Sequence, residues 1–205
     1  MANDVASARG FVTPWVSSLL AVSLLGPIQD LDGRFQGALQ AARQPQYEGV
    51  MRAATDLTKP VVVFGALVVV ASFTGPLGPE TVRCALLALV PTNIVVEGLK
   101  RGVNRTRPDG GHNPANASFP SSHAANGAAL AMVLGSRWRR LRIGFWVLAA
   151  TVALSRMYLN RHFLSDVLVA VAIGVGFGWW ATRRASWRPV SRAVRSGVTA
   201  AGRVW

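Results

Sequence analysis

The stretch FLSDVLVAVAIGVGFGWWA, residues 163–181, decides the fold of this chain. It is apolar apart from Ser165 and Asp166 near its start. A helix that crosses the hydrocarbon core of a bilayer needs roughly 17–25 such residues. We therefore expect this stretch to form a transmembrane helix.

Five further apolar segments precede it, at residues 11–28, 60–73, 81–99, 123–135 and 141–159. Segments 60–73 and 123–135 are short for a span, but the latter is mostly Ala and Gly, and small residues let helices approach closely inside a membrane bundle. The predicted fold is all-α, a polytopic membrane protein with a six-transmembrane-helix bundle. We expect a single domain over residues 1–205, with a core at about 60–181 and a basic cytoplasmic tail at 182–205.

The composition supports a membrane protein and argues against a nucleic-acid-binding one. Apolar residues make up 51% of the 205-residue chain and charged residues only 15%, whereas soluble domains are nearer a quarter charged. The net charge of +13 comes with no basic amphipathic helix or RNA-binding signature, so we expect a lipid bilayer as partner and no nucleic acid. Cys84 is the only cysteine, which excludes an intramolecular disulfide. The N-terminus lacks the features of a cleaved signal peptide, so its first apolar segment is predicted to be a retained span.

Residues 30–58, between the first two apolar segments, are polar and compatible with a short helix. Leu31, Phe35 and Leu39 recur every four residues and would form one apolar stripe. Two interpretations stay open: a helix packed on the bundle, or an interfacial helix at the lipid surface.

The arginines predict the orientation in the membrane. Four of them follow the fourth apolar segment (Arg137, Arg139, Arg140 and Arg142), and six more lie after the sixth. The positive-inside rule makes both regions cytoplasmic, so both termini are expected inside. The loops after the first, third and fifth segments then face outward. We place the active site on that outer side, because the motifs described next lie there.

The first motif is KRGVNRTRP, residues 100–108. Lys100 and Arg107 suit phosphoryl oxygens, since Arg offers a planar fork and Lys a point charge. An ordinary basic juxtamembrane loop is the alternative. Glu97, inside the third apolar segment, is predicted to orient a cation, with Lys100 and Arg101 as candidate partners.

The second motif is FPSSH, residues 119–123. Ser121 or Ser122 could simply cap a helix. The same geometry gives an anion site, because the free backbone N–H groups at a helix N-terminus attract negative charge. His123 would then lie beside the bound phosphate as a general acid.

The third motif runs from Ser155-Arg156 through His162 to Asp166. On a helix, His162 and Asp166 would share a face, so that the carboxylate could accept one imidazole N–H and activate the other nitrogen. A surface His–Asp pair at a helix start is the alternative. Arg156 would point away on a continuous helix, so a break near residues 157–161 is needed for both to reach one site.

Together these motifs read K-x6-RP, PS-x-H and SR-x5-H-x3-D, in this order. In this the chain resembles the phosphatidic acid phosphatase type 2 superfamily, and within it the integral-membrane bacterial lipid phosphatases, over roughly residues 60–181. One departure is Ser122, where the middle motif of the family most often has Gly. Since that position would act through its backbone N–H, Ser can replace Gly there.

The resemblance implies a reaction and a role for each motif residue. Five residues would bind the phosphate: Lys100, Arg107, Ser121, Ser122 and Arg156. His162 would attack phosphorus and form a phosphohistidine, Asp166 would orient it, and His123 would protonate the leaving group. No cofactor or metal is expected, because the cations and helix N–H groups neutralise the phosphate.

The expected function is hydrolysis of a lipid phosphomonoester or pyrophosphate at the outer leaflet. The resemblance implies a bacterial inner membrane, with the active site facing the periplasm. Candidate substrates are polyprenyl pyrophosphate, phosphatidylglycerophosphate and phosphatidic acid, with a larger headgroup such as lipid A phosphate also open. Vanadium haloperoxidases share the motifs but are soluble and larger, which disfavours that activity. A membrane protein that binds or transports lipid phosphates without hydrolysis is the second alternative, disfavoured because His123, His162 and Asp166 are all present. The sequence does not reveal the oligomeric state.

Overall fold

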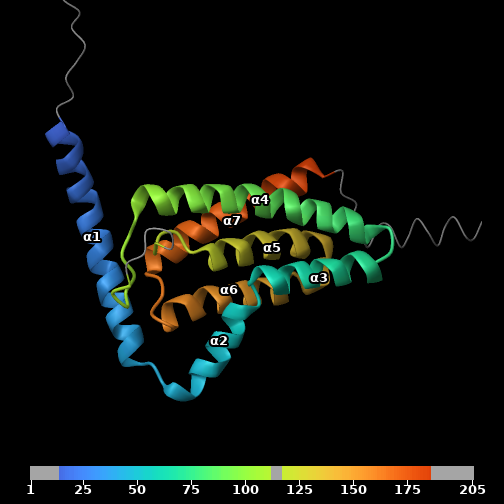
Figure 1. Cartoon of the computed structure of the whole chain (residues 1–205), viewed down its shortest axis with the longest axis horizontal. Helices are drawn as coiled ribbons and strands as arrows, with labels where there is room; N and C mark the ends of the chain where they lie inside the picture. The colour runs from blue at the N-terminus through green and yellow to red at the C-terminus, as the bar shows by residue number, and fades with distance from the viewer. Residues whose placement is uncertain (1–13, 112–116, 186–205) are drawn as a thin grey trace, which may run out of the picture.

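The computed structural model describes residues 14–111 and 117–185, with residues 14–25 described by their backbone alone (Figure 1). Its α-helices are α1 (Pro14–Ala41), α2 (Glu48–Asp56), α3 (Pro60–Phe73), α4 (Leu77–Val103), α5 (Ser122–Arg137), α6 (Arg142–Tyr158) and α7 (Leu164–Arg184). Two short 3-10 turns, Pro45–Tyr47 and Arg139–Leu141, are the other regular elements in this part of the chain. The predicted all-α fold is confirmed for these residues.

Helices α3 to α7 run alongside one another, and α1 lies across one end of them (Figure 1). Helix α5 is the centre of the bundle, because it packs against α4, α6 and α7. Its Ala and Gly residues make this possible, as expected from the sequence. On α7, a Cβ added to Gly174 would lie 2.1 Å from the carbonyl oxygen of Ala125, so only Gly allows the two backbones to come this close.

The number of membrane spans is confirmed only in part. By length and composition, α4 and α7 can each cross a membrane, and the pair Pro45–Asp56 and Pro60–Phe73, bent by 58°, would make a third span. Helices α3, α5 and α6 have 14, 16 and 17 residues, or about 21–26 Å at 1.5 Å per residue, which is short of a hydrocarbon core of roughly 30 Å. The six-span bundle therefore stays a prediction.

Residues 30–58 form the suggested short helix only in part, as α2, which packs against α6, while the apolar stripe belongs to α1. Helix α1 continues from the first apolar segment to Ala41, and a turn leads into α2. Two residues of the predicted apolar stripe face outward, with Leu31 58% and Phe35 36% exposed, whereas Leu39 packs against the core and Asp32 and Gln36 are buried. Helix α1 thus packs on the bundle through Leu39 and two polar side chains, and it exposes Leu31 and Phe35.

All three motifs lie at the end of the bundle that α1 crosses, which confirms that they converge. The C-termini of α4 and α6 and the N-termini of α5 and α7 meet there (Figure 1). The arginine-rich connection from α5 to α6 and the C-terminus of α7 lie at the opposite end. Residues 11–13 of the first predicted span, His112, and residues 186–205 of the predicted tail lie outside the described part.

Candidate active site

A polar cavity of about 540 Å³ opens at the end of the bundle where the motifs meet. It brings together six of the eight predicted site residues: Lys100, Arg107, Ser122, His123, Arg156 and His162. Ser121 and Asp166 are fully buried and connected to each other, because the Ser121 N–H donates a 3.3 Å hydrogen bond to the Asp166 carbonyl oxygen. The remaining lining residues are Arg43, Arg52, Thr55, Asp56, Lys59, Leu159 and Arg161.

Lys100 reaches the cavity from the last turn of α4. The helix ends at Asn104, whose left-handed φ of 47° is a conformation that Asn tolerates at helix C-termini. The Lys100 Nζ lies 3.1 Å from a Glu97 carboxylate oxygen. Of the two partners considered for Glu97, the structure therefore selects Lys100.

Arg156 occupies the corresponding position in the last turn of α6. Its Nη1 donates to Thr55 Oγ1 on α2 at 3.3 Å, and its buried Nε has no hydrogen-bond partner among the described residues. The predicted break follows directly: α6 ends at Tyr158 and Asn160 adopts a left-handed φ of 58°. The chain thus turns back so that Arg156 and His162 line the same cavity.

The N-terminus of α5 carries the second motif. Ser121 is the N-cap residue and α5 begins at Ser122, but neither hydroxyl makes a capping hydrogen bond. Both Oγ atoms are buried and lack a partner among the described residues. Together with the helix N–H groups, these donors form the kind of anion site that a phosphate would occupy.

His162 is held in one tautomer by the loop before α5. Its Nδ1 lies 2.6 Å from the Ser118 carbonyl oxygen, which can only accept, so Nδ1 carries the proton and Nε2 the lone pair. Burial lowers the pKa of His162 well below its usual value, and the charges of Arg156 and Arg107 lower it further. The imidazole is therefore neutral near pH 7, as a nucleophile must be.

Asp166 contacts His162 differently from the sequence-based expectation. Helix α7 begins only at Leu164, so the two residues do not share a helix face, and His162 Nδ1 is 3.9 Å from Asp166 Oδ2. This oxygen instead accepts hydrogen bonds from Ser118 Oγ at 2.5 Å and from the Phe163 N–H at 2.8 Å. Asp166 therefore orders the Ser118 segment that in turn binds His162.

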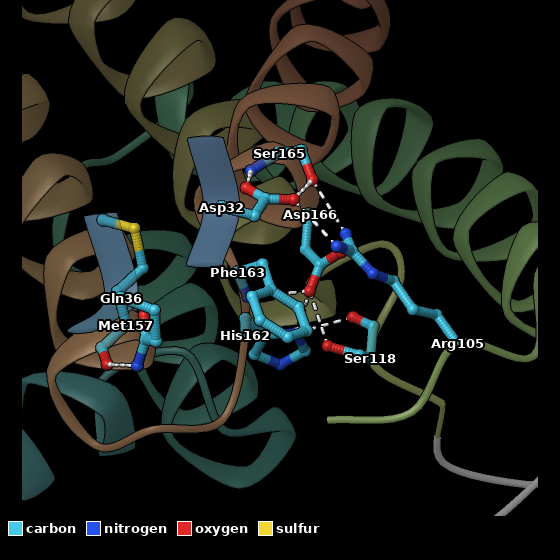
Figure 2. Close-up of polar contacts among 9 residues, drawn as sticks. All are labelled: Asp32, Gln36, Arg105, Ser118, Met157, His162, Phe163, Ser165 and Asp166. Atoms are coloured by element: carbon cyan, nitrogen blue, oxygen red, sulfur yellow. Dashed lines mark hydrogen bonds and ion pairs between the residues drawn. The ribbon is translucent and has the colours of Figure 1, made fainter. Parts of the chain in front are cut away.

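Four residues of this network were not predicted as site residues from the sequence: Asp32, Arg105, Ser118 and Ser165 (Figure 2). Arg105 belongs to the first motif, but its charge pairs with Asp32 and Asp166 at 2.8 and 2.6 Å. The sequence alone does not distinguish the role of Arg105 from that of Arg101 or Arg107 in the same motif. Asp32 lies on α1, one position after Leu31 of the apolar stripe and so about 100° round the helix from it.

The arrangement has the groups for phosphoryl transfer. A neutral histidine, a second histidine and seven basic side chains, among them the motif residues Lys100, Arg107 and Arg156, line one cavity. The described residues include no group of three His, Cys, Asp or Glu side chains placed to hold a metal ion.

Comparison with known proteins identifies the family. Residues 81–189 match the PAP2 superfamily, and the chain belongs to it. This is the family that the three motifs predicted.

The most informative relatives act on phosphorylated lipids. Decaprenylphosphoryl-5-phosphoribose phosphatase of Mycobacterium tuberculosis is 41% identical over 86 residues, which cover 39% of this chain and 48% of that protein. Lipid A 1-phosphatase of Porphyromonas gingivalis is 34% identical over 93 residues, or 42% of this chain and 20% of that protein. The chain thus matches less than half of the length of either.

The fold also matches a solved structure. The crystal structure of the transmembrane PAP2-type phosphatidylglycerolphosphate phosphatase of Bacillus subtilis aligns with a TM-score of 0.67 and 23% identity, covering 85% of this chain and 96% of that one. This likeness supports the fold, which therefore has the architecture of a membrane-embedded PAP2 protein.

Proposed function

We propose that this protein hydrolyses a lipid phosphate, with His162 as nucleophile. The observation that carries the proposal is the single cavity in which both motif histidines face Lys100, Arg107 and Arg156. The lining has seven basic side chains in all and one carboxylate, Asp56, so a bound anion would relieve the mutual repulsion of the cations. A phosphoryl group supplies that charge, and its oxygens suit the Arg forks.

The proposed reaction starts from the neutral form of His162. Nε2 of neutral His162 attacks phosphorus, so that a P–N bond forms as the P–O bond to the leaving group breaks. His123 gives its proton to the departing oxygen and then takes one from the water that attacks the phosphohistidine. Inorganic phosphate leaves, and His162 is regenerated. The cations, the Ser121 and Ser122 hydroxyls and the α5 N–H groups stabilise the negative charge throughout.

An apolar cavity next to the polar one supports a lipid substrate. It has a volume of about 210 Å³, lies between α3, α5 and α6, and has almost only apolar side chains in its lining. Leu57 and Thr58 at its edge directly follow Asp56 of the polar cavity. A substrate whose phosphate occupies the polar cavity could extend its hydrocarbon chain into this one.

The substrate class is a phosphomonoester or pyrophosphate on a membrane lipid. The relatives are named for a decaprenyl-linked phosphoribose and for lipid A, and the matched structure for phosphatidylglycerophosphate. Polyprenyl pyrophosphate, phosphatidylglycerophosphate and phosphatidic acid are thus the first substrates to test. We propose that the reaction needs no metal ion.

We further propose a six-span protein of the bacterial inner membrane, with both termini in the cytoplasm and the site facing outward. The asymmetry of charge supports this, since the exposed Arg139 and Arg140 lie at the end opposite the cavity. A Cys84→Ala protein removes the only native thiol. In that background an impermeant thiol reagent should label Gly110→Cys and not Arg140→Cys in intact spheroplasts. The reverse pattern would overturn the orientation.

The decisive experiment is phosphate release from a panel of lipid phosphates by detergent-purified protein, with and without EDTA. Wild type should be active in both conditions, and His162→Ala should lose activity by several orders of magnitude. His112→Ala is the matched control, because the motifs give that histidine no role. Full activity of His162→Ala would refute the mechanism, loss with EDTA would reveal a metal, and an inactive wild type that still binds the lipids would favour a binding protein.

A further inference from the structure

We infer that Asp32, on α1, is a positioning residue for His162 that acts through Arg105 and Asp166. The inference rests on the proposed function, because it concerns the same nucleophile. Asp32 lies outside residues 81–189, which carry the family match, and outside every motif described above.

Asp32 connects α1 to the start of α7. One carboxylate oxygen accepts the Ser165 N–H at 2.8 Å, and the other accepts Ser165 Oγ–H at 2.5 Å and Arg105 Nη2 at 2.8 Å (Figure 2). The side chain is only 2% exposed. A buried carboxylate with three donors is fixed in position, because each lost donor would leave an unsatisfied charge.

Arg105 divides its guanidinium between two carboxylates. Nη2 binds Asp32, and Nη1 binds Asp166 Oδ1 at 2.6 Å and Ser165 Oγ at 2.8 Å. The planar group also stacks on the Phe163 ring, with Cζ 4.2 Å from the ring centroid. Arg105 does not line the cavity, whereas Arg107, two residues later, does. Its role is therefore to hold carboxylates and not to bind the substrate phosphate.

The network ends at the nucleophile. Asp166 Oδ2 accepts the Ser118 hydroxyl at 2.5 Å, and the carbonyl of the same Ser118 accepts the His162 Nδ1–H at 2.6 Å. Asp32 therefore orients Arg105, Arg105 orients Asp166, and Asp166 fixes the residue that sets the tautomer and direction of the imidazole. Without Asp32, Arg105 keeps one carboxylate where it had two, and Ser165 loses both of its contacts to α1.

A consequence is that α1 belongs to the catalytic unit. Misplacing a reacting group by about 1 Å can cost roughly 100-fold in rate. The phosphate ligands do not touch Asp32, so its removal should change the turnover number and leave phosphate affinity intact.

The test compares Asp32→Asn with Asp30→Asn, a matched control two residues earlier on α1 whose side chain is exposed. With wild type and His162→Ala alongside, kcat is measured on the best lipid phosphate, and the inhibition constant of inorganic phosphate reports binding. We expect Asp32→Asn to lower kcat about 10- to 100-fold with the inhibition constant within about twofold of wild type, and Asp30→Asn to change neither. Combining Asp32→Asn with Arg105→Gln should cost no more than Arg105→Gln alone.

Three results would overturn the inference: kcat of Asp32→Asn equal to that of Asp30→Asn, a parallel loss of phosphate binding, or fully additive effects in the double variant. If Asp32→Asn does not accumulate as folded protein, Arg105→Lys tests the same link, because it keeps the charge but loses the fork. It should lower kcat and spare phosphate binding. An inactive wild type would instead refute the proposed function.

Discussion

Replacing Gly174 by Ala should damage the active site from the middle of the bundle. Gly174 lies on α7 where this helix packs on α5, and an added Cβ would lie 2.1 Å from the Ala125 carbonyl oxygen. Ordinary contact begins at 3.4 Å, so the helices must move apart by about 1.3 Å, the difference between these distances. The obstacle is backbone, which cannot rotate away as a side chain would.

The displacement acts directly on the catalytic pair. Helix α5 carries His123 in its first turn, and α7 begins two residues after His162. Overpacking of this kind costs about 1–3 kcal/mol of stability, and a shift of about 1 Å between reacting groups costs roughly 100-fold in rate. We therefore expect Gly174→Ala to lower the Tm in detergent by several degrees and kcat about 10- to 100-fold.

Gly176→Ala is the matched control on the same helix. Its Cβ would meet no atom within 4 Å, and Ala is favoured over Gly in a helix by about 0.5–1 kcal/mol, so the Tm should stay level or rise and kcat should not change. Thermal unfolding and phosphate release on both purified variants decide the matter. If Gly174→Ala is as stable and active as Gly176→Ala, the close approach of α5 and α7 does not position the site.

Three further predictions concern the charges of the cavity. The pKa of His162 is lowered by burial and then by Arg156 and Arg107, so the neutral, active imidazole is lost only as the pH falls through this low pKa. Arg107→Gln removes one of these cations and should raise the pKa, which moves the acidic limb of the kcat/KM profile to higher pH. An unmoved limb would contradict this. Arg156→Lys keeps the positive charge but loses the planar guanidinium and its contact to Thr55. It should lower kcat/KM for phosphate release about 100-fold. Wild-type rates would show that a point charge suffices. Glu97→Gln should change KM less than about fivefold, because the Glu97 side chain is 45% exposed and solvent screens its pair with Lys100; a loss as large as that of Lys100→Ala would contradict it.

Much of the bundle could be predicted because polar residues, Pro and Gly mark the helix ends. The segment predicted at residues 60–73 coincides with α3, Pro60–Phe73, which starts at a proline and ends before Thr74-Gly75. The later segments lie within a few residues of α4 to α7. Helix α1 was misjudged because apolar content ends near residue 28, whereas helical backbone continues past Pro27 to Ala41. Hydropathy locates the apolar part of a helix and says little about a polar continuation.

The sequence allowed most residues of the site to be predicted, but not the hydrogen bonds that join them. Motif residues at successive helix ends must meet if the helices are antiparallel, and they do. A direct contact between His162 and Asp166 was expected on the assumption that both residues lie on one helix. Helix α7 begins only at Leu164, however, and the imidazole N–H donates to the Ser118 carbonyl instead. Such a carbonyl has no signature in the sequence, since every residue has one.

The face of α1 that hydrogen-bonds the bundle is lined by polar side chains, which in a soluble protein would usually face the solvent. Asp32, Gln36 and Gln40 recur every four residues, as the apolar stripe does. Gln36 and Gln40 donate to the Met157 carbonyl at 3.0 and 3.2 Å, and Gln40 also to the Tyr158 carbonyl at 3.2 Å. These carbonyls belong to the last turn of α6, where the helix ends and the regular N–H donors of a further turn are missing. Where lipid surrounds a helix, apolar residues can face outward, so they no longer indicate which face is buried. Polar side chains cannot be satisfied by lipid and must find hydrogen-bond partners inside the protein. On α1 the side chains that hydrogen-bond the bundle therefore form a polar stripe, and this stripe begins at Asp32.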